Sequence, residues 1–82
     1  MTHNQNIVLI KVAVATDKGQ WYRAAGSGER VTLASLYRRQ WLKRRAHRGI
    51  EGEADAAYEY QSIEMITSKI VEMIRELQRK RT

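Results

Sequence analysis

Large aliphatic side chains are scarce in this chain, and this scarcity limits the folds that it can adopt. Five leucines, seven isoleucines and five valines make up about 21% of the 82 residues, and phenylalanine is absent. Highly charged chains with less than about 20% of these residue types do not bury enough apolar surface to fold. The sequence therefore predicts a single small domain over residues 1–82 with a thin core, and it excludes a second core or a dinucleotide-binding sheet.

The absence of cysteine narrows the class of protein further. It removes disulfides, thiolate metal sites and thiol nucleophiles together, so a disulfide-stapled secreted domain is excluded. The longest apolar stretch, Ile7 to Ala15, is too short to span a membrane and is interrupted by Lys11. The residues before it are polar and unlike a signal peptide. We therefore expect a cytoplasmic protein that does not enter a membrane.

The N-terminal apolar run favours a β-strand because it is short and rich in β-branched side chains. Thr16 to Gly19 resembles a turn closed by a glycine, and Gln20 to Ala25 can return as a second strand. These segments predict a β-hairpin over about residues 7–25, although the same composition also admits a helix. A lone hairpin is unstable, so its apolar face requires helices to cover it.

Two helices are expected after the hairpin. Thr32 suits the start of the first, at about residues 33–48, and Gly49 suits its end. The second, at about residues 54–79, has acidic residues near its start, basic residues near its end and apolar residues at helical spacing. The predicted fold class is therefore α+β: an N-terminal β-hairpin followed by two α-helices, of which the C-terminal one is long and amphipathic.

The positive charge is concentrated in one segment. The chain has a net charge of +6, and residues 38–48 alone contain six bases and no acid. Arginine predominates among these bases, and its guanidinium group can hold phosphate through two hydrogen bonds. The candidate nucleic-acid-binding residues are Arg38, Arg39, Lys43, Arg44, Arg45 and Arg48. A secondary contact is expected at Arg79, Lys80 and Arg81.

A helical wheel spreads these bases over several sides of the expected helix, which favours contact with phosphates on several sides, as in a groove. We therefore expect a small basic regulatory or accessory protein that binds nucleic acid such as DNA mainly through phosphate, with weak sequence specificity. Trp41 within the segment either stacks on an unpaired base or, as its position near Tyr37 favours, packs in the core.

Two alternatives to nucleic-acid binding remain. One is a protein-interaction module, an inhibitor or an adaptor, that docks its arginine-rich helix on an acidic surface of a larger protein. The other is a solvated basic face that has no specific anionic partner. A salt-sensitive complex with nucleic acid separates the first expectation from both alternatives.

The C-terminal helix also carries a pattern for self-association. Five apolar residues occupy heptad positions a and d, namely Ile63, Ile66, Ile70, Met73 and Leu77. They predict a homodimer interface, which supplements a thin core and presents two basic segments to a duplex. The alternative is that the same residues cover the hairpin within one chain.

Catalytic and cofactor-binding groups are few. The chain has two histidines and two aspartates, and its serines have no histidine at a recognisable spacing, so we expect neither enzyme activity nor a cofactor. His47, Glu51, Glu53 and Asp55 form the only local cluster of metal-ligating types in the sequence. Their spacing is unlike a zinc motif, and acids at a helix start already have an electrostatic role, so we expect no metal site.

Overall fold

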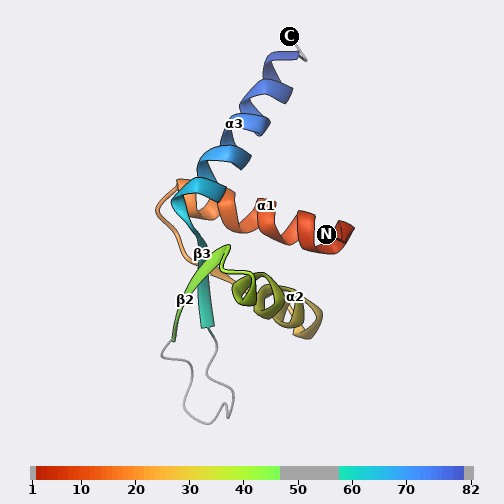
Figure 1. The fold of residues 1–82 in the computed structure, drawn as a ribbon, viewed down its shortest axis with the longest axis vertical. Helices are drawn as coiled ribbons and strands as arrows, with labels where there is room; N and C mark the ends of the chain where they lie inside the picture. The colour runs from red at the N-terminus through yellow and green to blue at the C-terminus, as the bar shows by residue number, and fades with distance from the viewer. Residues whose placement is uncertain (1, 47–57, 81–82) are drawn as a thin grey trace.

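The computed structural model describes residues 2–46 and 58–80, which form helices and a small antiparallel sheet. Along the chain these elements are α1 (His3–Asp17), β1 (Tyr22–Arg23), α2 (Ser27–Arg38), β2 (Leu42–Ala46), β3 (Tyr58–Ser62) and α3 (Glu64–Lys80). In the sheet, β3 lies between β1 and β2 and is antiparallel to both. Figure 1 shows α1 between α2 and α3, with α3 rising away from the body.

The chain begins with a helix, so the predicted N-terminal hairpin over about residues 7–25 is wrong. The Thr2 hydroxyl accepts a hydrogen bond from the Gln5 amide, and the Gln5 side chain accepts one from the Thr2 amide. This capping box satisfies backbone amides that a helix start leaves without partners. The apolar run that follows remains helical because it packs against α2 and α3 on different sides.

Gly19 ends α1 and accounts for the turn signal that suggested a hairpin. Its φ of 75° is left-handed, a conformation that glycine adopts at little cost. The amides of Gly19 and Gln20 donate to the carbonyls of Thr16 and Ala15, which closes the last turn of the helix. The chain then enters β1, which has only two residues and pairs with β3 rather than with the apolar run.

The helix predicted at about residues 33–48 is also wrong in its extent. Helix α2 starts earlier and ends at Arg38, and the arginine-rich segment continues as strand β2. Gln40 makes the turn between them with a φ of 64°, and its amide donates to the Tyr37 carbonyl. The expected end of the helix, Gly49, lies outside the described residues.

The long helix predicted at about residues 54–79 starts later than expected. Residues Tyr58–Ser62 form strand β3, and α3 begins at Glu64. Residues 54–57 lie outside the described part of the chain. The register of β3 between β1 and β2 explains the difference, because backbone pairing on both edges holds this segment extended.

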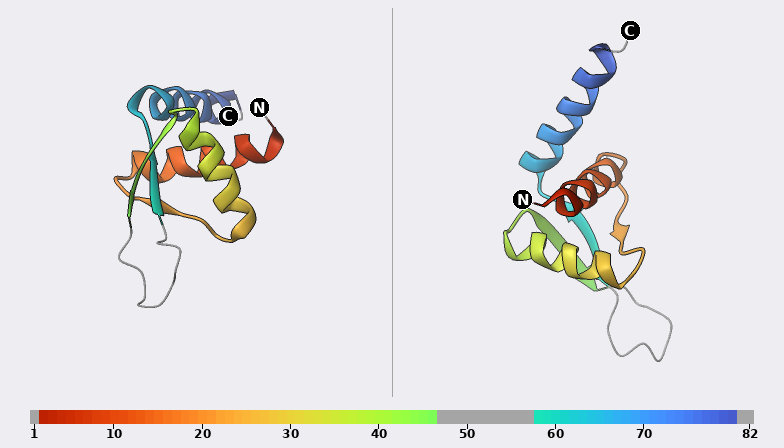
Figure 2. Two further views of the ribbon diagram at one scale, coloured as in Figure 1. Left: turned by 60° about the horizontal axis from the view of Figure 1, so that its bottom comes forward. Right: turned by 90° about the vertical axis from the view of Figure 1, so that its right-hand side faces the viewer.

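The core is small and is centred on α1. Figure 2 shows from two further sides that α2 and α3 lie on opposite sides of this helix. The buried apolar residues are Val8, Leu9, Val12, Ala13, Leu33, Leu36, Leu42, Tyr60 and Ile70. Strand β2 contributes only its first residue, Leu42, and its other four residues are exposed. Most of β2 therefore lies in solvent.

Replacing Gln40 with glycine is expected to stabilise the fold. A left-handed conformation costs a residue with a side chain about 1–2 kcal/mol, and the greater freedom of glycine in the unfolded chain offsets part of the gain. We expect Gln40→Gly to raise the free energy of unfolding by up to about 1 kcal/mol, measured by urea denaturation followed by circular dichroism.

Gly19→Ala is the reverse change at the end of α1, where the glycine also has a positive φ. It should lower the free energy of unfolding by about 1 kcal/mol in the same measurement.

A Gln40→Gly variant that is less stable than the parent protein would contradict the left-handed turn described at the end of α2.

Candidate functional site

Strand β2 is a basic strand on the open edge of the sheet. It carries Lys43, Arg44 and Arg45 in succession, all exposed, and among the described residues it pairs on one side only, with β3. Because successive side chains of a strand point to opposite faces, Lys43 and Arg45 share one face and Arg44 lies on the other. The strand therefore presents positive charge on both of its faces.

The face of the sheet that carries Lys43 and Arg45 is termed the outer face. On this face a buried glutamate joins the three strands. Glu59 of β3 lies between Arg23 of β1 and Arg45 of β2 in the pairing register. Its carboxylate accepts a hydrogen bond from Arg23 Nε at 3.4 Å and one from Arg45 Nε at 3.3 Å. The Glu59 side chain is 10% exposed, whereas more than half of each arginine side chain is exposed. Glu59 thus positions both arginines without burying them.

Glu59 stays ionised despite its burial. Burial raises the pKa of its carboxyl group, but the hydrogen bonds and charges of Arg45 and Arg23 outweigh that effect and hold the pKa below its ordinary value. A carboxylate whose pKa is lowered in the folded state stabilises the fold above its unfolded pKa and loses that contribution as the pH falls through its folded pKa. At neutral pH the outer face therefore holds a carboxylate that two arginines neutralise.

Arg44, on the opposite face from Glu59, contacts two tyrosine rings. Its guanidinium carbon lies 4.1 Å from the centroid of the Tyr37 ring and 4.2 Å from that of the Tyr58 ring. The two rings come from different elements, the end of α2 and the start of β3. Cation–π contacts use the face of the guanidinium group and leave its N–H donors in the plane. This Arg44–tyrosine cluster (Arg44, Tyr37 and Tyr58) orients the arginine without occupying its donors.

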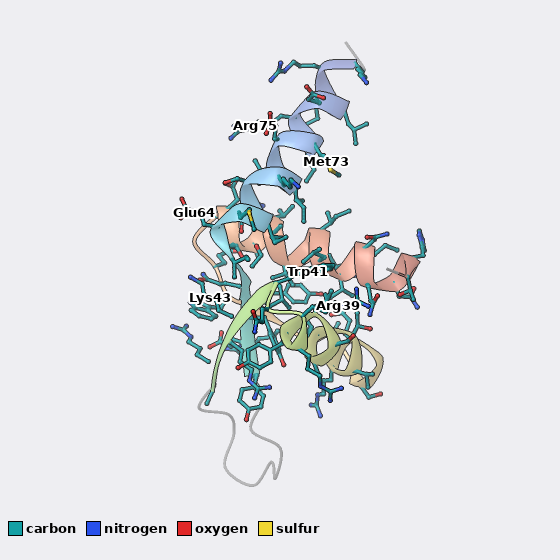
Figure 3. All side chains as sticks on the ribbon, in the orientation of Figure 1. Arg39, Trp41, Lys43, Glu64, Met73 and Arg75 are labelled. Atoms are coloured by element: carbon teal, nitrogen blue, oxygen red, sulfur yellow. The ribbon has the colours of Figure 1, made fainter. Side chains whose placement is uncertain are left out.

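Two further arginines contact tryptophan rings. The Arg45 guanidinium carbon lies 4.2 Å from the centroid of the Trp21 ring, and that of Arg39 lies 5.4 Å from the centroid of the Trp41 ring. Trp41 is half-buried and packs against the core, in agreement with the core-packing alternative for this residue. In Figure 3, Arg39 and Trp41 lie on one side of β2, and Lys43 lies on the other.

Five of the six candidate bases of the arginine-rich segment lie close together. They occupy the C-terminal end of α2 and strand β2, and all are exposed: Arg38, Arg39, Lys43, Arg44 and Arg45. The sixth, Arg48, lies outside the described residues. These bases belong to a helix end and a strand rather than to the single helix that the sequence predicted.

The bases of the expected secondary contact lie apart from this group. Arg79 and Lys80 are at the C-terminal end of α3, and Arg81 lies outside the described residues. Figure 1 shows that end of α3 at the opposite end of the molecule from β2. Within one chain, the two groups of bases therefore do not form one surface.

The five heptad residues, of which Ile63 immediately precedes α3 and the other four lie on it, divide into two groups. Ile70 is buried in the core, and Ile63 and Ile66 are half-buried, so part of the heptad pattern covers α1 within the chain. Met73 and Leu77 are exposed. The buried and half-buried group agrees with the alternative that these residues pack within one chain. The element that they cover is helix α1, however, and not a hairpin.

Sequence reasoning missed the residues that organise the basic strand. They are Trp21, Arg23, Tyr37, Tyr58 and Glu59, which come from three different parts of the chain. One signal for them was available, since the alternation of aromatic and polar residues from Tyr58 to Ser62 is typical of a strand. No local signal indicates the register that brings Arg23 and Glu59 beside Arg45.

A second charged cluster joins α2 to α1 and β1. Glu29 of α2 accepts hydrogen bonds from the Tyr22 hydroxyl at 2.6 Å, the Ala25 amide at 3.1 Å and Lys11 Nζ at 3.4 Å. The bond from Tyr22 is the main cause that lowers the pKa of Glu29. Burial and the bond to Glu29 raise the pKa of Tyr22 to about 12. Both groups keep their ordinary charge at neutral pH, and the hydrogen bonds of Glu29 connect α2 with α1 and with the β1 segment.

In the described residues, no three or more histidine, cysteine, aspartate or glutamate side chains gather closely enough to hold a metal ion. The cluster noted in the sequence (His47, Glu51, Glu53 and Asp55) lies outside those residues. None of the helices in the described ranges has both the length and the apolarity needed to cross a membrane. Comparisons with protein-family models, curated proteins and solved structures give no match to this chain.

Neutralising Glu59 is expected to destabilise the sheet at neutral pH. Glu59→Gln keeps the shape of the side chain but removes the negative charge to which Arg23 and Arg45 donate hydrogen bonds. The cost should lie between that of an exposed and that of a buried ion pair, about 1–3 kcal/mol in the free energy of unfolding. The difference from the parent protein should shrink as the pH falls below 4.5, the ordinary pKa of glutamate, and should be lost once the pH passes below the lowered pKa of Glu59 in the folded protein.

Urea denaturation at pH 7 and at pH 3 measures this difference. Glu72→Gln is the control, because Glu72 is exposed on α3 and forms no ion pair with another described residue. If the two variants had equal stability at pH 7, Glu59 would not have the role described.

Proposed function

We propose that this protein binds double-stranded nucleic acid through its phosphate backbone, with β2 and the end of α2 as the binding surface. The Arg44–tyrosine cluster is the observation that supports this most. Its arginine is exposed and oriented by two rings, and the guanidinium group makes no hydrogen bond or ion pair with the described residues. An arginine that is already oriented loses less freedom when it binds phosphate.

The distribution of the bases supports binding in a groove. Lys43 and Arg45 lie on one face of β2, Arg44 lies on the other, and Arg38 and Arg39 lie at the adjacent end of α2. The major groove of a duplex admits a two-stranded β-ribbon. Strand β2, at the edge of the sheet, can enter such a groove with phosphates on both sides, so the bases on both of its faces contribute to binding.

The aromatic side chains beside the basic strand favour a duplex over an unpaired strand. Tyr37 and Tyr58 contact Arg44, and Trp21 contacts Arg45. Proteins that bind single strands without sequence preference use open aromatic faces on which bases stack. Here an arginine guanidinium already lies over each of these rings, although Tyr37 and Tyr58 stay 36% and 40% exposed, so phosphate contact is expected to supply most of the binding energy.

Weak sequence specificity follows from the other polar side chains on the sheet. Reading of bases requires side chains that reach base edges with free hydrogen-bonding groups. Gln61 donates to the Gln20 carbonyl at 3.2 Å, and Glu59 accepts from two arginines. We therefore propose a small accessory or regulatory protein that recognises the charge and shape of nucleic acid more than its sequence.

Affinity for a duplex should fall steeply with salt. With about six phosphates contacted, the logarithm of the affinity falls with the logarithm of salt concentration at a slope of about −5. Replacing Lys43, Arg44 and Arg45 with alanine removes three contacts, so the slope should be halved and the affinity at low salt should drop at least about tenfold. Fluorescence anisotropy with a labelled duplex measures both quantities.

A variant that removes the same charge elsewhere is the control. Lys18, Arg30 and Arg75 are exposed bases away from β2, and their replacement with alanine should leave most of the affinity and the slope intact. Equal losses in the two triple variants would contradict a binding surface on β2. Absence of binding to both duplex and single strands at low salt would favour the acidic protein surface as the partner.

Arg44→Lys tests the Arg44–tyrosine cluster without changing the net charge. The planar guanidinium group of arginine contacts the two rings and can bond phosphate through two donors, and lysine has no such group. The affinity for the duplex should therefore fall about threefold to tenfold. Arg38→Lys is the matched control, because Arg38 belongs to the same surface, is exposed and has no ring contact among the described residues, so it should weaken binding clearly less than Arg44→Lys does. Equal effects of the two substitutions would show that ring contact does not matter.

A further inference from the structure

The C-terminal half of α3 has an apolar edge that the rest of the described chain leaves uncovered. Ile70 is buried and Ile74 packs against the core, whereas every described residue after Ile74 is exposed. Met73 and Leu77 are 55% and 61% exposed. Figure 3 shows Met73 on the part of α3 that rises away from α1.

An apolar groove lies beside this edge, between α1 and α3. It has a volume of about 480 Å³, and the apolar residues that line it are Leu9, Ile10, Trp41, Ile66, Ile70 and Met73. At helical spacing, Leu77 continues the row of Ile66, Ile70 and Met73 beyond the end of the groove. The groove and the exposed edge therefore form one continuous apolar surface.

We propose that α3 of a second copy of this chain fills the groove, in an antiparallel dimer with two-fold symmetry. In antiparallel pairs of helices, position a of one helix packs with position d of the other. Ile66 then packs with the partner's Leu77, and Ile70 packs with the partner's Met73. The symmetry repeats both layers, so the exposed residues of each copy enter the groove of the other.

Charge favours the antiparallel orientation. In this register, Lys69, which also lines the groove, lies beside the partner's Glu76, and the symmetry repeats the pair. Within one chain, neither Lys69 nor Glu76 forms an ion pair with another described residue. A parallel dimer would instead bring the basic C-terminal ends of the two α3 helices together, where they repel each other.

Sedimentation equilibrium of the full chain from micromolar to millimolar concentration tests the dimer. The parent protein should pass from monomer to dimer over this range, and Leu77→Glu should raise the dissociation constant at least about thirtyfold. Met65→Glu is the matched control, since Met65 is 67% exposed on the same helix but does not line the groove. A parent protein that stays monomeric, or a Met65→Glu variant that dissociates as readily as Leu77→Glu, overturns the proposal.

Charge reversal tests the register. Lys69→Glu and Glu76→Lys should each weaken the dimer about threefold to tenfold, because each places like charges together. The double variant restores opposite charges and should dimerise within about twofold of the parent protein. A double variant as weak as either single one overturns the antiparallel register. Nucleic acid is absent from both experiments, so their outcome is independent of the proposed function.

Discussion

The burial of α1 supports every other part of the fold. This helix supplies Val8, Leu9, Val12 and Ala13 to the core and contacts α2, α3, β1 and β3. In a chain with few large aliphatic residues, collecting them in one helix allows several elements to share the same apolar surface. The core reaches β2 only through Leu42. The rest of this edge strand therefore stays in solvent, where charged side chains are favourable.

Charge and aromatic contacts, rather than burial, order the side chains of the exposed strand. Glu59 lowers the net charge of the outer face, but it also relieves the repulsion between Arg23 and Arg45 and positions both. On the other face, two tyrosine rings position Arg44. The proposed nucleic-acid surface depends on this order. The proposed dimer has its origin in the same thin core, which leaves one edge of α3 uncovered.

The location of the positive charge can be read from the sequence, because five of the bases are close in sequence and remain close in the fold. The secondary structure that carries these bases cannot be read from the sequence. The apolar run of residues 7–15 has no period that separates a helix from a strand, and the capping pattern of Thr2 and Gln5 is the local signal that identifies it as a helix. Helix α2 ends at Arg38 and the chain turns at Gln40, where neither glycine nor proline marks the end. The position of Glu59 depends on strand pairing between distant segments, which no local pattern specifies.

Mapping the surface that contacts a DNA duplex, by NMR of isotope-labelled protein during a titration at low salt, tests the proposed interface most directly. The largest changes in amide chemical shift should fall on residues 37–39 and 43–45, at the end of α2 and along β2. Residues 72–80 of α3 should change little. Changes confined to α3, or spread evenly over the chain, would contradict an interface built on the basic strand.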